Sequence, residues 1–160
     1  MEAIVAVYSD WGIGCGGTQP VTLRADRRHF SEVTKGAAVI AGRKTLADFP
    51  GGRPLKNRVN IVLTRGNTQI DGAVVVNSAA EAVAEAKKYP RAFVIGGASV
   101  YGQLLPLVDR VYVTKIEAGP RSDSFFPDLD ADPAWRLAGV GEELEEDGIR
   151  YRFLVYSRHI

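Results

Sequence analysis

Short apolar runs alternate with amphipathic segments along the first two-thirds of the chain. The apolar runs are rich in Val, Ile and Ala, as expected of strands that are buried on both faces of a sheet. We therefore expect strands at residues 3–8, 37–41, 59–64, 73–76, 92–95 and 110–116. Between them the pattern predicts helices at residues 23–34, 79–88 and 98–105, and a short one that ends at Asp48. Ser78 with Glu81 has the spacing of a capping box at the start of the helix at 79–88.

The last quarter of the chain has a different pattern. Two strand-like runs, at 135–140 and 149–157, flank an acidic segment at 142–147 that ends in Asp147-Gly148. Asp-Gly between such runs indicates a hairpin, and we expect the acidic segment to be a solvated turn. The whole pattern predicts one domain over residues 1–160, of three-layer α/β/α architecture. Its sheet would have about eight strands, mainly parallel, with an antiparallel C-terminal strand.

One connection is too long and too rich in glycine to be regular structure. Residues 9–22 contain four glycines and Pro20, and loops of this length in compact domains are often functional lids. Trp11 and Ile13 within the loop favour a lid that packs against the rest of the protein.

Composition and charge exclude several classes of function. The net charge is +1 and the Lys and Arg residues are scattered, so nothing indicates nucleic-acid binding. Cys15 is the one cysteine, and His29 lies far from His159, so we expect no disulfide and no metal site. We expect no membrane segment, since no apolar run reaches about 20 residues. The chain begins as a strand without a preceding basic region, so we expect a cytoplasmic protein, and by default a monomer.

The segment at residues 91–101 is the first candidate for ligand binding. A buried strand ends at Ile95, Gly96-Gly97 follows, and a helix begins at Ala98. This order places bare backbone N–H groups at the carboxyl edge of a sheet, where open α/β folds bind phosphate groups. A tight turn between strand and helix explains two glycines nearly as well.

Cations follow two other predicted strands at the same edge. Gly42-Arg43-Lys44-Thr45 follows the second strand and Thr64-Arg65 follows the third. A dinucleotide with an additional ribose phosphate would use such a set, with Arg43 and Arg65 taking the extra charge. Each cation taken alone is more simply an ordinary surface residue, whereas three at matching strand ends favour a ligand site.

Asp26 is the candidate catalytic carboxylate. Phe30 lies one helical turn later on the same face and would provide an apolar wall. A carboxylate that faces an apolar pocket can bind an amide-like heterocycle or take part in proton transfer. From spacing alone, stabilisation of the helix terminus by an exposed Asp is the simpler interpretation.

Taken together, these segments resemble the bacterial chromosomal type of dihydrofolate reductase over nearly the full length. The resemblance rests on short motifs whose order and spacing agree. They are Ile4-Val5-Ala6, Ile13-Gly14, Pro20, Leu23-x-x-Asp26-x-x-x-Phe30, Gly42-Arg43-Lys44-Thr45, Arg53-Pro54-Leu55, Arg58, Asn60, Ile95-Gly96-Gly97-Ala98-x-Val100-Tyr101, Tyr112-x-Thr114, Asp123 and Phe126-Pro127.

The resemblance implies reduction of 7,8-dihydrofolate to tetrahydrofolate by hydride transfer from NADPH, in one-carbon metabolism. Methotrexate or trimethoprim would then be expected as inhibitors. Asp26 would assist protonation of the pterin, and Thr114 would hold Asp26. The other substrate-binding residues would be Ile4, Val5, Ala6, Arg27, Phe30, Phe49, Leu55, Arg58, Ile95 and Tyr101, with Arg58 taking the glutamate α-carboxylate.

The resemblance also implies the cofactor site. Ala6 and Ile13 would flank the nicotinamide, Arg43, Thr64 and Arg65 would lie near the 2′-phosphate, and Gly96-Gly97 would form a cis peptide beside the pyrophosphate. The other residues of this set would be Gly14, Gly42, Lys44, Thr45, Leu63, Ile95, Ala98, Ser99, Val100 and Tyr101.

Three positions depart from the family pattern. Val21 stands where the family usually has Trp, Arg27 replaces an apolar wall residue, and Ser122 stands where glycine is common. We hypothesise that Arg27 adds a cation near the glutamate tail of the substrate and weakens diaminopyrimidine inhibitors. Two other functions are considered: a reductase of the riboflavin-biosynthesis type that acts on a ribosylamino-pyrimidine, and a catalytically silent NADPH-binding module.

Overall fold

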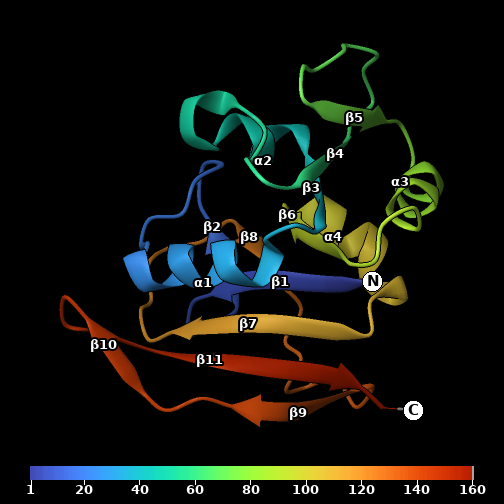
Figure 1. The fold of residues 1–160 in the computed structure, drawn as a ribbon. Coiled ribbons are helices and arrows are strands. Elements are labelled where there is room, and N and C mark those ends of the chain that lie inside the picture. The colour runs from blue at the N-terminus through green and yellow to red at the C-terminus, as the bar shows by residue number, and fades with distance from the viewer. Residues whose placement is uncertain (160) are drawn as a thin grey trace. The chain divides into compact units, whose positions relative to one another are not determined.

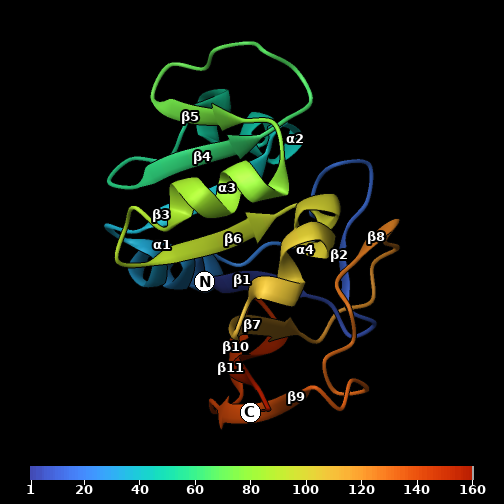
Figure 2. The same ribbon diagram turned by 90° about the vertical axis from the view of Figure 1, so that its right-hand side faces the viewer.

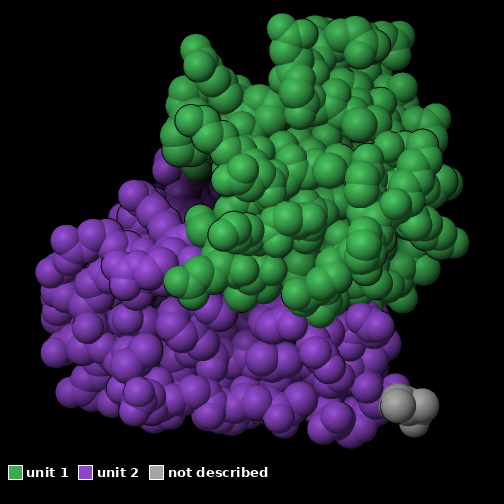
Figure 3. All heavy atoms as spheres, in the orientation of Figure 1, with its two compact units in different colours: residues 1–3, 31–108 green, residues 4–30, 109–160 purple. Residues whose placement is uncertain are grey.

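The structure, a computed structural model, describes residues 1–159. The chain divides into two compact units, which Figure 3 shows in different colours. Unit 1 comprises residues 1–3 and 31–108, and unit 2 comprises residues 4–30 and 109–160. That the two units form a single domain stays a prediction.

Unit 1 is built on parallel strands. The first residues of β1 (Glu2–Val7) pair with β6 (Ala92–Gly96), which pairs with β3 (Ala38–Gly42). Strand β3 pairs with β4 (Val59–Leu63), and β4 pairs with β5 (Ala73–Val76). All these pairings are parallel, and the strands supply a core of fully buried side chains that includes Ile40, Ile61 and Phe93.

Helices cover these strands in unit 1. They are α2 (Arg43–Ala47), α3 (Ala79–Ala86) and α4 (Ala98–Leu104), with short 3-10 turns at Pro50–Gly52 and Leu105–Leu107. The connections from β3 to β4 and from β5 to β6 run in opposite directions along the strand order, so right-handed crossovers place α2 and α3 on opposite faces. Figure 2 shows α3 and α4 on the face turned toward the viewer.

The predicted cap of α3 is confirmed, with one difference. The Ser78 hydroxyl accepts a hydrogen bond from the Glu81 N–H at 3.1 Å. The Glu81 carboxylate accepts from the backbone N–H of Asn77 at 2.7 Å, one residue before the position that the capping box predicts. Both interactions hold the chain as it enters the helix.

Unit 2 combines the rest of β1 with the C-terminal strands. Strand β7 (Arg110–Ile116) neighbours β1, and β11 (Ile149–Arg158) runs antiparallel to β7. Strands β9 (Trp135–Val140) and β10 (Leu144–Glu146) both pair antiparallel with β11. Helix α1 (Arg24–Thr34) lies in this unit up to Phe30. Figure 1 shows the order of these elements along the chain.

The predicted sheet is confirmed: it is mixed and mainly parallel, and its C-terminal strand is antiparallel. Residues of β1 belong to both units, and eight strands are paired in the order β10-β11-β7-β1-β6-β3-β4-β5. Strand β9 is outside this order and pairs with β11. The hairpin turn at Asp147-Gly148 is also confirmed, with φ values of +51° and +81°. The turn closes β10 against β11, so part of the acidic segment is strand rather than turn.

The expected lid contains a short strand that the sequence pattern does not indicate. Strand β2 (Gly12–Gly14) pairs antiparallel with β8 (Ser124–Phe125). Trp11 is buried, and its ring packs against Phe126 and Tyr156 at centroid distances of 6.4 and 5.9 Å. The expectation that the loop packs on the protein is therefore confirmed. No helix within residues 1–159 is long and apolar enough to cross a membrane, and those residues contain no cluster of His, Cys, Asp or Glu suited to a metal ion.

Candidate active site

A half-buried carboxylate lies in unit 2 where helix α1 meets strand β7. Asp26 is in the first turn of α1, and its Oδ1 accepts a hydrogen bond of 2.6 Å from the Thr114 hydroxyl. Thr114 is 1% exposed, so this bond is shielded from water. Burial raises the pKa of Asp26, while the Thr114 hydroxyl, His29 and Arg27 oppose the rise. The carboxyl therefore takes up a proton closer to neutral pH than an exposed Asp does.

The position of Asp26 follows from how α1 is anchored. Leu23 precedes the helix and packs in an apolar cluster with Tyr8, Ile116 and Tyr151. The Glu146 carboxylate accepts hydrogen bonds from the Arg24 and Ala25 N–H groups at 2.8 and 3.0 Å. The expectation that the acidic segment is only a solvated turn is therefore wrong at Glu146. The sequence could not indicate this contact, because about 120 residues separate its partners.

The glycine-rich loop is fixed at several points within unit 2. The Gly16 N–H donates to the Asp123 carboxylate at 2.9 Å, and Cys15 and Thr18 form a small bridge around Gly16-Gly17. The Lys115 ammonium lies 4.0 Å from the centre of the Trp11 ring. Ile13 and Ala6, the residues expected beside a nicotinamide, are half-buried in β2 and β1.

In unit 1, three glycines come together near the start of α4. Gly96-Gly97 is a cis peptide, as the resemblance implies. A Cβ on Gly42 would lie 3.2 Å from a methyl group of Val100 and 3.9 Å from the Gly96 carbonyl oxygen. Gly96 has φ of +125°, a conformation that other residues rarely adopt. These glycines leave bare backbone around the helix start, beside the Thr45 hydroxyl, which lies 3.4 Å from the Cβ position of Gly97.

A second group in unit 1 lies after strand β4. The Thr64 hydroxyl accepts from the Gly66 N–H at 3.2 Å, and an Arg43 nitrogen lies 3.7 Å from the Cβ position of Gly66. The side-chain amide of Asn77 donates to the carbonyl groups of Thr64 and Gly66 at 2.9 and 2.8 Å. Arg43, Lys44 and Arg65 are exposed. The structure thus places Arg43 and Thr64 both beside Gly66, and it adds Gly66 and Asn77, which the sequence pattern does not indicate.

Arg58 is held by its neighbours in unit 1. Its guanidinium donates to the Thr34 hydroxyl at 2.8 Å and to the carbonyl groups of Lys56 and Ser31 at 2.7 and 3.4 Å. Burial lowers the pKa of Arg58, but a guanidinium stays charged at neutral pH. These three hydrogen bonds fix the orientation of the guanidinium.

Asn60 fixes the loop that carries Arg58. Its buried side chain bonds both the N–H and the C=O of Leu55 at 2.9 Å and reaches the Arg58 carbonyl at 3.3 Å. The sequence pattern indicates no role for Asn60, and its only signal is a polar residue within an otherwise apolar strand.

The remaining predicted residues divide between the two units. Unit 2 contains Ile4 and Val5, which are buried in β1, and it contains Gly14, Arg27 and Phe30. Unit 1 contains the half-buried Phe49, Leu55 and Leu63, the buried Ile95, Val100 and Tyr101, and the exposed Ala98 and Ser99. Arg27 is exposed, and its guanidinium donates to the Thr22 hydroxyl at 3.3 Å.

Comparison with known proteins agrees with these observations. The family model described as dihydrofolate reductase matches residues 1–158. Dihydrofolate reductase from Bacillus subtilis is 36% identical over 158 residues, covering 97% of this chain and 92% of the relative. The Mycobacterium tuberculosis enzyme is 40% identical over 151 residues, covering 91% and 90%.

A solved structure extends the match to three dimensions. The dihydrofolate reductase of Enterococcus faecalis, complexed with NADP(H) and RAB-propyl, superposes with a TM-score of 0.89 at 32% identity. The match covers 99% of this chain and 96% of that one. With the family model matching nearly the whole sequence, the chain belongs to the dihydrofolate reductase family.

Proposed function

We propose that this protein reduces 7,8-dihydrofolate to 5,6,7,8-tetrahydrofolate with NADPH as the hydride donor. The observation that carries the proposal is the Asp26–Thr114 pair, in which a half-buried carboxyl with a raised pKa accepts a hydrogen bond from a buried hydroxyl. A carboxyl in this state can bind the amide and amino groups of a pterin and favour protonation of its ring. The family match supports this activity over a riboflavin-type substrate.

The cofactor assignment is supported by the glycine cluster and the Arg43–Thr64 group of unit 1. Bare backbone at Gly96-Gly97 and Gly42 fits a pyrophosphate, and a guanidinium beside a hydroxyl fits a 2′-phosphate. The Enterococcus faecalis relative was solved with NADP(H). When bound, NADPH supplies the hydride. The residues of this chain hold and orient it, and we assign that task also to Ala6, Ile13, Thr45 and Arg65.

The substrate assignment follows the same logic. Asp26 holds the pterin and keeps a proton available at its carboxyl, while Thr114 fixes the Oδ1 atom. Arg58, already oriented by Thr34 and Lys56, takes the α-carboxylate of the glutamate. Ile4, Val5, Phe30, Phe49 and Leu55 provide apolar contacts for the rings. Inhibitors such as methotrexate and trimethoprim would use the same residues, in a cytoplasmic and monomeric enzyme.

The test is NADPH oxidation by the purified protein in the presence of dihydrofolate. The Asp26→Asn variant should bind NADPH as the parent does and lose about 100-fold or more in turnover, as expected when proton transfer is impaired. Asp71→Asn, at an exposed turn residue, is the matched control and should be fully active. A parent protein that binds NADPH tightly without reducing dihydrofolate would contradict the proposal and favour the silent binding module.

A further inference from the structure

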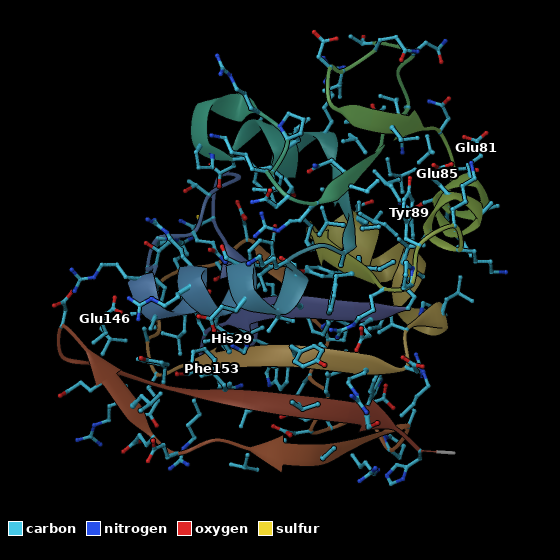
Figure 4. All side chains as sticks on the ribbon, viewed as in Figure 1. His29, Glu81, Glu85, Tyr89, Glu146 and Phe153 are labelled. Carbon is cyan, nitrogen blue, oxygen red and sulfur yellow. The ribbon has the colours of Figure 1, made fainter. Side chains whose placement is uncertain are left out.

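The C-terminal hairpin β10–β11 contacts helix α1 on both sides of Asp26. Before Asp26, the Glu146 carboxylate accepts from the Arg24 and Ala25 N–H groups with one oxygen each. After it, the ring of Phe153 stacks on His29 with centroids 4.1 Å apart and planes inclined by 25°. Figure 4 labels Glu146, His29 and Phe153, and shows His29 turned toward Phe153 of β11.

The first contact bears on what Asp26 is free to do. The first N–H groups of a helix have no partner within the helix, and a carboxylate in the first turn is attracted to them. Asp26 is such a carboxylate, the third residue of α1. Here two of these donors already have a partner in Glu146, and Asp26 instead accepts from Thr114 on β7. Glu146 therefore performs the capping that a sequence-based interpretation would assign to Asp26.

We propose that Glu146 is a positioning residue for the reductase: by occupying the start of α1 it leaves the Asp26 carboxylate to Thr114 and to the substrate. This inference rests on the proposed function. Glu146 contacts neither substrate nor cofactor in this assignment, and its effect passes entirely through Asp26.

The charges around this helix terminus set the direction of the effect. Arg24, Arg27, Arg28 and His29 lie on α1, Glu146 lies on β10, and Asp147 follows Glu146 in the turn. Arg24 contacts Glu146 at 3.7 Å and Asp147 at 3.4 Å.

Within residues 1–159, the neighbouring strands β7 and β11 add no carboxylate here. From β7, Thr114 donates to Asp26, while the Lys115 ammonium lies against the Trp11 ring. β11 contributes the uncharged Phe153. Glu146 is the one carboxylate among residues 1–159 whose oxygens accept from Arg24 N–H and Ala25 N–H, so its removal exposes the positive helix end.

The experiment follows the carboxyl carbon of Asp26 by ¹³C NMR as the pH is varied, in the parent and in Glu146→Gln, both with NADPH. The Asp26→Asn variant assigns the signal. Loss of the Glu146 charge frees the helix end to stabilise the ionised form of Asp26, so the pKa of Asp26 should fall. Glu145→Gln is the matched control, because Glu145 is the exposed neighbour on the same strand, and its substitution should leave the titration unchanged.

Turnover provides the second measurement. Glu146→Gln should reduce kcat/KM for dihydrofolate several-fold while the Kd for NADPH is unchanged. In an Asp26→Asn background the same substitution should have no further effect, because it acts through Asp26. An unchanged or raised pKa of Asp26, or an equal loss of activity in the Asp26→Asn background, would overturn the inference. Failure of the parent to reduce dihydrofolate would instead overturn the proposed function, and the NMR titration distinguishes the two.

Discussion

The hydroxyl of Tyr8 bonds both backbone groups of Val21. It donates to the Val21 carbonyl at 2.8 Å and accepts from the Val21 N–H at 3.0 Å. Tyr8 directly follows β1 and is 1% exposed, and burial raises the pKa of its hydroxyl, so it remains a neutral donor and acceptor. The backbone of Val21 thus fixes the glycine-rich loop at a position where the family usually has Trp. The Val21 side chain contributes only packing.

Tyr8→Phe should therefore loosen the end of the glycine-rich loop. Two partly buried backbone groups lose their partner, and we expect a loss of about 1–3 kcal/mol in the free energy of unfolding. Urea denaturation measures it, and hydrogen exchange at the Val21 N–H should accelerate. Tyr89→Phe, at a half-buried Tyr in unit 1, is the control and should change neither quantity. Equal stability of Tyr8→Phe and the parent would show that the double hydrogen bond contributes nothing.

Thr114→Val should raise the pKa of Asp26 further. The Thr114 hydroxyl donates to the carboxylate and so favours its ionised form; without that donor, burial acts with less opposition. The limb of the pH–rate profile that reports Asp26 should move to higher pH. Thr68→Val, in an exposed loop, should leave the profile where it is. A shift toward lower pH would contradict the assigned role of Thr114.

Gly12 and Ser122 are in direct contact, and their substitutions should be coupled. A Cβ on Gly12 would meet the Ser122 hydroxyl, and it would lie 2.6 Å from the Ser122 Cβ. Gly12→Ala should therefore cost about 1–3 kcal/mol of stability. Adding Ser122→Gly should recover part of the loss, since the hydroxyl of Ser122 is buried without a hydrogen-bond partner among residues 1–159, while the contact of the new Cβ with Asp10 Oδ1 at 2.9 Å remains.

The control for this pair is Gly102→Ala. A Cβ there meets nothing within 4 Å, and the position is helical, so this change should stabilise the protein slightly. Additive effects of Gly12→Ala and Ser122→Gly would show that the two residues do not constrain each other.

Arg27 should weaken binding of diaminopyrimidine inhibitors. It is exposed beside Asp26 and stands where the family has an apolar wall, so an inhibitor ring placed against it removes water from a cation. Arg27→Leu should tighten trimethoprim binding by about tenfold, which corresponds to 1.4 kcal/mol. Arg28→Leu, one position further along α1, should not change the affinity. An inhibitor Kd that is the same in Arg27→Leu and the parent would remove this explanation.

The sequence pattern predicts best those elements of the fold that depend on residues close together in the chain. The parallel strands, the Ser78 cap and the Asp147-Gly148 turn depend on nearby residues, and each lies within a residue or two of its expected position. Contacts over long separations gave no local signal. Strand β2 exists only because β8 pairs with it, and Glu146 caps a helix that begins at Arg24. The dual role of the Tyr8 hydroxyl likewise could not be inferred from an apolar run.

The division of the chain into units has a consequence for its synthesis. Unit 1 is drawn almost entirely from the continuous stretch 31–108, whereas unit 2 needs residues 4–30 together with those from 109 onward. On the ribosome, the stretch that forms unit 1 is therefore complete while Asp26 still lacks Thr114, Glu146 and Phe153, which have not been translated. The nascent chain can bring Gly42, Gly96 and Gly97 together early, whereas the contacts that hold the Asp26 carboxyl form only after the last hairpin leaves the exit tunnel.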